Sequence, residues 1–471
     1  MVLTEPRQRA TKPKEGQTAF VVDRLAQGLK SYEGWGHAPI NLGKLLVGTT
    51  CREGRRGGPT QYVWSMGFRS GRAAWQRFRV KSAPQLTETE LFAKLGDAVV
   101  PESFDVAPPD TIAGWCGGRH LLDRTFDADN LFGDAVLMGF RLDAFKLPAD
   151  LRRAWQLQNE EALSAAEPGS SKSAIRKAAR EEVDDRARRE MTLGLHRSSR
   201  MFPVLWDRAG GVLLAPTPSD AARTALVDLA RLTLDLELEP ESAGVFAESF
   251  AASRGVLRDL EDATPTSFGP PPRGHEGGQV PTVGWGRAPH PHDFLGSEFL
   301  LDLWCRAERG AEDEVEAAIT EALDMRCAWE AGGDQGLRSN TPARSPEARR
   351  GLKNGKWPRK AGLMIASGLE HWTLILDGVR FAPSAVRLPE PAERPETERE
   401  GLEARVDAFL SCDRALTKLY RGFLERRLDA ARWSSEAAVI KRWIAADGQS
   451  SPSFEIEVPR EAPESVEAKQ D

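Results

Sequence analysis

The stretch Phe202-Pro-Val-Leu-Trp-Asp-Arg-Ala-Gly-Gly-Val-Leu-Leu-Ala215 decides the fold. Its apolar ends, 202–206 and 212–215, predict two short strands, and 207–211 between them predicts the turn of a hairpin. Ser219 then stands where a helix N-cap is expected, before an amphipathic run from Ala221 to Leu234. A hairpin followed at once by a helix is a building block of α+β folds.

A second segment repeats this layout. His371 to Leu376 predicts a strand, Asp377-Gly378 predicts a type I′ turn, and Val379 to Phe381 predicts the returning strand. A long helix is expected from about Thr397 to Leu428, because apolar residues recur along it at helical spacing. Two such units in one chain indicate a duplicated subdomain.

Other segments belong to the N-terminal half. Trp75 to Val80 alternates as a half-buried strand does, and Ala135 to Leu142 is a further apolar run. Thr87 to Leu95 predicts a helix with a threonine cap. Residues 149–195 are strongly charged and predict a projecting helical hairpin, with its second helix starting at Ser171.

Composition divides the chain into five parts. Residues 1–82 carry fifteen Lys and Arg against five Asp and Glu. A clearer apolar pattern begins at Met66, and one hypothesis is that the native protein starts at this residue. The predicted parts are a poorly ordered basic extension (1–72), an N-terminal α+β half (73–261) that includes the charged helical hairpin (149–195), a Pro/Gly-rich linker or insertion (262–293), a C-terminal α+β half (294–445) and a disordered acidic tail (446–471).

Composition also argues against several classes of protein. The longest apolar runs, such as Ala135 to Phe140, are too short to span a bilayer, and the N-terminus has no signal-type apolar core. The five cysteines are scattered without a C-x-x-C pair, which argues against a disulfide framework or a zinc ribbon. His290-Pro-His292 lies in a Pro- and Gly-rich stretch and is interpreted as a loop. We therefore expect a cytoplasmic protein without a metal or cofactor.

A block of positive charge lies between Thr341 and Lys360. It holds seven cations against one acid, Glu347, in a chain whose net charge is -6. A concentrated cationic block on an acidic chain indicates a site for a polyanion, and nucleic-acid phosphate is the usual one. The seven cations are Arg344, Arg349, Arg350, Lys353, Lys356, Arg359 and Lys360.

The same block contains a glycine-lysine motif, Gly351-Leu-Lys-Asn-Gly355-Lys356. A phosphate-binding Walker A loop needs four residues between its glycines and a Ser or Thr after the lysine, whereas here three residues intervene and Trp357 follows. Nucleotide binding at this position is therefore excluded. Ser345 as cap and Gly355 as exit predict a short helix instead, with Arg349, Lys353 and Lys356 on one face. A solvated basic face without a ligand remains an alternative.

A second, weaker set of cations lies on the charged hairpin. Lys172, Arg176 and Arg180 fall at i, i+4 and i+8 of the predicted helix. Ion pairs within a charged helix explain this spacing at least as well as contact with DNA. Catalysis has little support, because the chain has no G-x-S-x-G or H-E-x-x-H motif.

In their order and spacing, several stretches resemble the bacterial recombination-associated RdgC family over about residues 73 to 430. The resemblance implies an α+β fold of repeated antiparallel sheet-plus-helix subdomains, which matches the two hairpin-then-helix units. It also implies a ring-shaped homodimer that encircles duplex DNA without sequence preference, restrains RecA-driven recombination and lines its pore with basic residues. It is carried by Trp75-Gln-Arg-Phe-Arg-Val80, Gly114-Trp115, Phe140-Arg-Leu-Asp-Ala-Phe-Lys-Leu-Pro148, Leu205-Trp-Asp-Arg-Ala-Gly-Gly-Val-Leu-Leu214, Glu298-Phe-Leu-Leu-Asp-Leu-Trp304, Gly355-Lys356 before His371-Trp-Thr-Leu-Ile-Leu376, and Val406-Asp-Ala-Phe-Leu410.

These observations together predict a non-enzymatic, sequence-independent binder of duplex DNA associated with the nucleoid. Two alternatives stay open, a metal-dependent nuclease with unlocated carboxylates and a scaffold whose basic block docks an acidic protein. The predicted DNA contacts are the seven cations of the block, Arg338 in the preceding loop, and the weaker set Lys172, Arg176 and Arg180.

Overall fold

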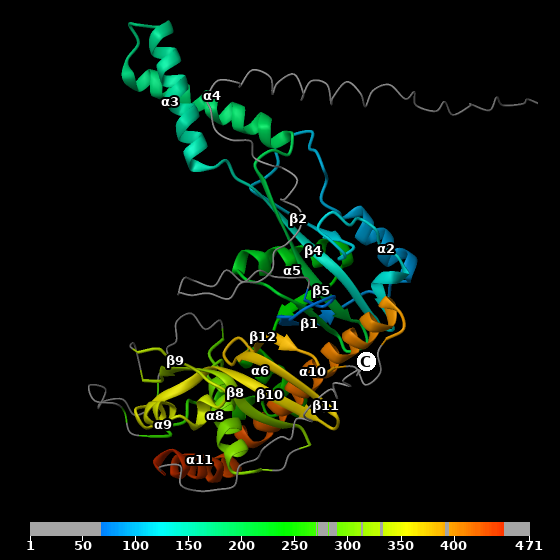
Figure 1. Cartoon of the computed structure of the whole chain (residues 1–471), viewed down its shortest axis with the longest axis vertical. Coiled ribbons are helices and arrows are strands. Elements are labelled where there is room, and N and C mark those ends of the chain that lie inside the picture. The colour runs from blue at the N-terminus through cyan, green and yellow to red at the C-terminus, as the bar shows by residue number, and fades with distance from the viewer. Residues whose placement is uncertain are drawn as a thin grey trace, which may run out of the picture. The chain divides into compact units, whose positions relative to one another are not determined.

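The computed structural model describes residues 67–269, 271, 281, 290–311, 314–329, 333–390 and 395–446. The predictions for most of the basic extension, for Met66, for most of 270–289 and for the acidic tail after Ala446 lie outside these residues. Within them the chain forms two antiparallel sheets with packed helices, so the α+β fold class is confirmed (Figure 1).

The first sheet has the strand order β2-β4-β5-β6-β1-β7, with β3 paired to β4. Its longest pair is β4 with β5, in register from Ala135 opposite Asp207 to Phe145 opposite Arg197. The strands are β1 Gln76–Ser82, β2 Thr111–Cys116, β3 Leu131–Phe132, β4 Ala135–Phe145, β5 Arg197–Asp207, β6 Val212–Ala215 and β7 Glu237–Pro240.

Two helices complete the core of this sheet. α2 (Glu88–Asp97) and α5 (Asp220–Leu234) contribute buried leucines to the same apolar cluster as the strands. Both helices begin where their sequences predict, since Thr87 forms a capping box and Ser219 accepts the Ala222 N–H.

The predicted charged helical hairpin is present between β4 and β5. α3 (Ala149–Ala166) and α4 (Lys172–Thr192) share a small apolar core that includes Trp155 and Val183. Ser171 caps α4 as expected, with its side chain accepting the Ala174 N–H at 3.3 Å. The remaining faces of both helices are charged and mostly exposed.

The second sheet has the order β12-β11-β10-β8-β9. Its helices pack around a dense aromatic cluster that includes Phe299, Phe381 and Tyr420, and the Tyr420 hydroxyl donates to the Ala243 carbonyl at 2.9 Å. Its strands are β8 Glu316–Cys327, β9 Gln335–Arg338, β10 Lys356–Ser367, β11 Glu370–Asp377 and β12 Ala382–Arg387. Its helices are α6 Ala243–Arg254, α7 Leu257–Glu261, α8 Leu295–Glu308, α9 Pro346–Lys353, α10 Glu398–Arg427 and α11 Ala430–Ala445, with the short turns η2 Ala128–Asn130 in the first half and η3 Pro342–Arg344 in the second.

Packing places several segments differently from the predicted division at 72, 261 and 293. α6 and α7, which the sequence assigned to the N-terminal half, contribute to one large apolar cluster that contains the second sheet and also Leu137, Leu205 and Leu214 of the first. Phe68 is buried against Phe409, and Arg405 donates to the Phe68 carbonyl, so residues 67–72 belong to the packed part of the chain. Phe268, from the predicted linker, is buried against Trp357.

The hairpin turn after β11 differs from the predicted two-residue type I′ turn. β12 starts only at Ala382, and Phe381, not Gly378, takes the left-handed conformation, with φ 49°. Gly378 serves another purpose, because a Cβ on Gly296 of α8 would lie 1.9 Å from its carbonyl oxygen. The glycine pair therefore lets the turn pack directly on α8. The hairpin of β5 and β6 has the same four-residue turn, ending at Gly211 with φ 63°.

No helix in the described part of the chain is long and apolar enough to cross a membrane.

Candidate nucleic-acid interface

A large groove with a surplus of positive charge lies beside the second sheet. Its volume is about 1730 Å³, and it is bounded by α8, η3, α9, the second half of α10, α11 and the first half of β8. Among the described residues that line it are ten Lys and Arg against five Asp and Glu, a surplus of five charges. Six of these cations lie outside the basic block of the sequence, namely Arg306, Arg309, Lys418, Arg421, Arg426 and Arg442. We call this surface the cationic groove.

The basic block supplies the other four cations through η3 and α9. α9 begins and ends as predicted, with Ser345 accepting the Ala348 N–H at 3.2 Å and Gly355 at φ 73° after its last turn. Arg344, Arg350 and Lys353 are exposed at the groove. Since α9 buries its apolar face of Ala348, Gly351 and Leu352, these cations are held on a fixed helix.

The fourth cation, Arg349, is part of the packing. Its guanidinium lies 5.6 Å from the Trp304 ring centroid and 4.8 Å from that of Trp443, and it pairs with Glu308. The Glu308 carboxylate also accepts the indole N–H groups of Trp304, at 2.8 Å, and of Trp443, at 3.0 Å. This Glu308 cluster (Glu308, Trp304, Arg349 and Trp443) ties α8, α9 and α11 together and forms one wall of the groove.

Arg349 and Arg350 are adjacent on α9 and permit a matched comparison. Arg349→Met is expected to lower the free energy of unfolding by about 1.5–3 kcal/mol, since it removes charge-assisted hydrogen bonding at a largely buried carboxylate. Arg350→Met, at an exposed position, is expected to change it by less than about 0.5 kcal/mol. Urea unfolding of both variants checks this. Equal stabilities would show that the Glu308 cluster does not hold α9.

The remaining cations of the block do not line the groove. Lys356 begins β10, so the prediction that it shares a helix face with Arg349 and Lys353 is wrong. Its ammonium donates to the Gln335 side chain at 3.2 Å, and Lys360 pairs with Asp377 at 3.1 Å. Arg359 lies on the same strand and is partly buried, while Arg338 on β9 pairs with Asp324 at 2.6 Å.

Among the residues that line the groove is a buried ion pair. Asp302 on α8 is 2% exposed and accepts a hydrogen bond from the Arg426 guanidinium at 2.6 Å. Burial raises the pKa of Asp302, although Arg426 acts in the opposite direction. A pair of this kind fixes α10 against α8, so Arg426 serves mainly to hold the groove together.

The exposed cations are the ones able to meet a ligand. The carboxylates of Asp302, Glu308 and Glu314 already pair with Arg426, Arg349 and Lys418, respectively. Long exposed cations on a rigid frame suit the backbone of a nucleic acid, whose phosphates are contacted without fixed geometry. Besides Lys418, the exposed cations are Arg309, Arg344, Arg350, Lys353, Arg421 and Arg442.

The weaker predicted set lies on a different surface. Lys172, Arg176 and Arg180 are exposed on α4, and none of them lines the groove. Arg176 lies 3.9 Å from Glu160 of α3. Further ion pairs cross or follow the hairpin, such as that of Arg186 with Glu190 at 2.9 Å. The hairpin therefore carries interleaved charges of both signs.

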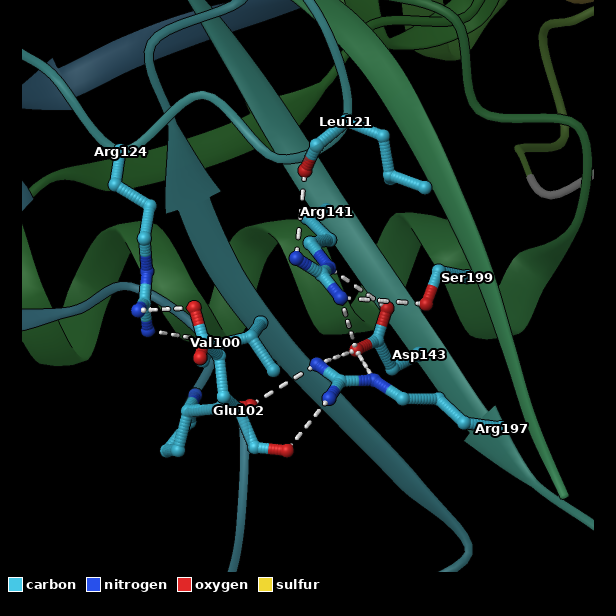
Figure 2. A network of polar contacts seen from close by, with 9 residues as sticks. Val100, Glu102, Leu121, Arg124, Arg141, Asp143, Arg197 and Ser199 are labelled. Carbon is cyan, nitrogen blue, oxygen red and sulfur yellow. Dashed lines mark hydrogen bonds and ion pairs between the residues drawn. The ribbon is translucent and has the colours of Figure 1, made fainter. Parts of the chain in front are cut away.

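A second polar network lies on the first sheet (Figure 2). The buried Asp143 carboxylate accepts two hydrogen bonds from Arg141, at 2.9 and 3.0 Å, and pairs with Arg197 of β5. Arg197 also donates to the carbonyls of Pro101 and Glu102. Burial opposes ionisation of Asp143, but the hydrogen bonds from Arg141, Ser199 and Arg197 outweigh it and hold its pKa below the ordinary value. The network links β4 to β5 and has a structural role, and no motif in the sequence indicated it.

Comparison with known proteins adds no assignment. No protein-family model matches the chain, and no curated protein is detectably related to it. Within the described ranges, no three His, Cys, Asp or Glu side chains are grouped so that they could hold a metal ion.

Proposed function

We propose that this protein binds the sugar–phosphate backbone of duplex DNA in the cationic groove, without reading the base sequence. The observation that carries the proposal is the surplus of five positive charges among the described residues around a groove of about 1730 Å³. The chain as a whole has a net charge of -6, so the positive surplus is local to this surface. A local positive surface attracts a polyanion while the rest of the molecule repels it.

The aromatic residues of the groove favour phosphate contacts over base stacking. Trp304 and Phe299 are almost completely buried, and Trp443 holds the Glu308 cluster. Proteins that bind single strands present aromatic faces on which bases stack. Among the described lining residues these faces are used for packing, which favours a duplex recognised by its charge.

Salt dependence tests the proposed function. The seven exposed cations predict that the logarithm of the affinity falls with the logarithm of salt concentration with a slope of about −4 to −6. A gel shift on duplex DNA of unrelated sequences, over a salt series with and without magnesium, measures this slope. Absence of binding at low salt would refute the proposal, and shortened DNA in magnesium would favour the nuclease alternative.

The resemblance to the RdgC family extends the proposal. It suggests a homodimer that surrounds DNA in the bacterial cytoplasm, associates with the nucleoid and antagonises RecA. The dimer is expected to show about twice the 51.8 kDa chain mass in light scattering after size exclusion. A monomer at every accessible concentration would contradict the ring-shaped dimer. DNA binding by the groove of a single chain would then be tested by the gel shift alone.

A further inference from the structure

The last described residue lies at the edge of the cationic groove. α11 ends at Ala445, and Ala446 lines the groove together with Arg442 and Trp443 of the same helix. The chain that follows, 447–471, therefore starts at the groove itself. Its sequence contains seven acidic residues and two basic ones, a net charge of −5 against the groove's surplus of five.

The acidic residues are interleaved with apolar ones. Phe454-Glu-Ile-Glu-Val458 alternates strictly between apolar and acidic side chains. In an extended conformation the two kinds of side chain point to opposite sides. The groove offers both kinds of partner, since Met364, Leu419 and Val439 are partly exposed on its walls beside the cations.

One wall of the groove is formed by β8. The first half of β8, from Glu316 to Ile319, pairs with β10 on one side. On its other side β9 pairs with the residues from Ala322 to Met325, the Ser339 N–H donates to the Glu321 carbonyl, the Thr320 hydroxyl donates to the Asn340 carbonyl at 3.1 Å, and η3 packs against β8. The chain that follows β9 therefore lies beside this part of β8 and shapes this wall of the groove.

We propose that the acidic segment 447–471 occupies the cationic groove of its own chain and excludes DNA while bound. The exclusion of DNA rests on the proposed function, whereas occupancy of the groove does not. A segment of this length spans up to about 80 Å when extended, which is ample for the groove. Tethering at Ala446 gives it an effective concentration on the order of 1 mM.

Binding of the segment in trans tests the occupancy. The receptor is the full chain with Glu455→Gln, Glu457→Gln, Glu461→Gln and Glu464→Gln, called here the neutral-tail variant, and the probe is a fluorescent peptide of residues 447–471. We expect saturable binding in fluorescence anisotropy at low salt. Affinity should fall at least about tenfold when Arg344, Arg350 and Lys353 are also changed to Glu, which removes three groove cations. It should be nearly unchanged when Lys172, Arg176 and Arg180 are changed to Glu instead.

Two outcomes overturn the assignment: a peptide that does not bind, and a peptide that binds equally well after the groove charges are reversed. A peptide made with the same four glutamines is the control and should bind at least about tenfold more weakly, because four charge contacts are lost.

A measurement of DNA binding by the same variants distinguishes a failure of this inference from a failure of the proposed function. The neutral-tail variant should bind duplex DNA about five- to tenfold more tightly than the unmodified chain. Peptide binding without DNA binding would keep the segment in the groove and refute the DNA function. DNA binding in the groove without peptide binding would refute only the segment. A gain in DNA affinity that disappears on dilution would assign the segment to a second copy and overturn the intramolecular contact.

Discussion

Changing Arg344, Arg350 and Lys353 together to Glu is expected to weaken duplex DNA binding about 1000-fold at low salt, since each lost phosphate contact accounts for about a tenfold change. All three side chains are exposed at the groove, and none belongs to the Glu308 cluster. The fold should therefore survive, with an unchanged urea midpoint. The salt slope should also become shallower by about 3.

The charged hairpin supplies the matched control for this experiment. Lys172, Arg176 and Arg180 are three exposed cations on one helix outside the groove, and their change to Glu alters the net charge by the same amount. Titration of both variants with one fluorescent duplex separates a local site from general charge. Equal losses would contradict the groove, and a larger loss for the hairpin variant would move the site to α4.

The largest effect on stability is expected at Asp143. Its carboxylate is completely buried between Arg141 and Arg197, so Asp143→Ala leaves two guanidinium groups without their partner. Removing one member of a buried charge cluster costs about 3–5 kcal/mol. Urea unfolding should show this loss, and β4 and β5 should show faster hydrogen exchange. A change below about 1 kcal/mol would mean that the network is not a structural tie.

The same network predicts a dependence of stability on pH. The pKa of Asp143 is lower in the folded chain than in the unfolded chain, so its contribution is present above the unfolded pKa and is lost as the pH falls. Asp143→Asn keeps the shape without the charge and serves as the control. From pH 6 to about pH 3 the unmodified protein should lose more stability than this variant. Parallel curves would contradict the assignment of the pKa.

Local signals in the sequence predicted much of the secondary structure. Thr87, Ser171, Ser219, Ser345 and Thr397 were expected at helix starts, and each accepts a backbone hydrogen bond as an N-cap. Such caps depend on residues three or four positions apart, which the sequence displays directly. The two hairpin-then-helix units were visible in the same way, and the resemblance added the α+β class, which the structure confirms.

Elements that depend on distant partners were harder to predict. β10 pairs with strands on both sides and yet begins Lys-Trp-Pro-Arg-Lys. A proline cannot donate a ladder hydrogen bond, so inside a sheet it is found at irregularities, and Pro358 lies at a register shift between β10 and β8. α8 is buried along Leu295–Cys305 and shows no polar face by which to recognise it. Neither segment has the periodicity of a half-exposed element.

The candidate site could be predicted only in part. Counting charges along the chain found Arg344, Arg350 and Lys353, because they are neighbours in sequence. The cations on α8, α10 and α11 join them only through tertiary packing. The role of Arg349 depends on Trp443, which lies far along the chain, so the sequence could not distinguish a packed arginine from a DNA contact.

The most direct test of the account is hydrogen exchange of the neutral-tail variant with and without saturating duplex DNA. If DNA lies in the cationic groove, peptides covering η3, α9 and α11 should exchange more slowly in the complex, while those covering α3 and α4 should not change. Slowed exchange confined to the charged hairpin, or unchanged exchange in α9 and α11 when DNA is bound, would contradict the groove as the DNA-binding site.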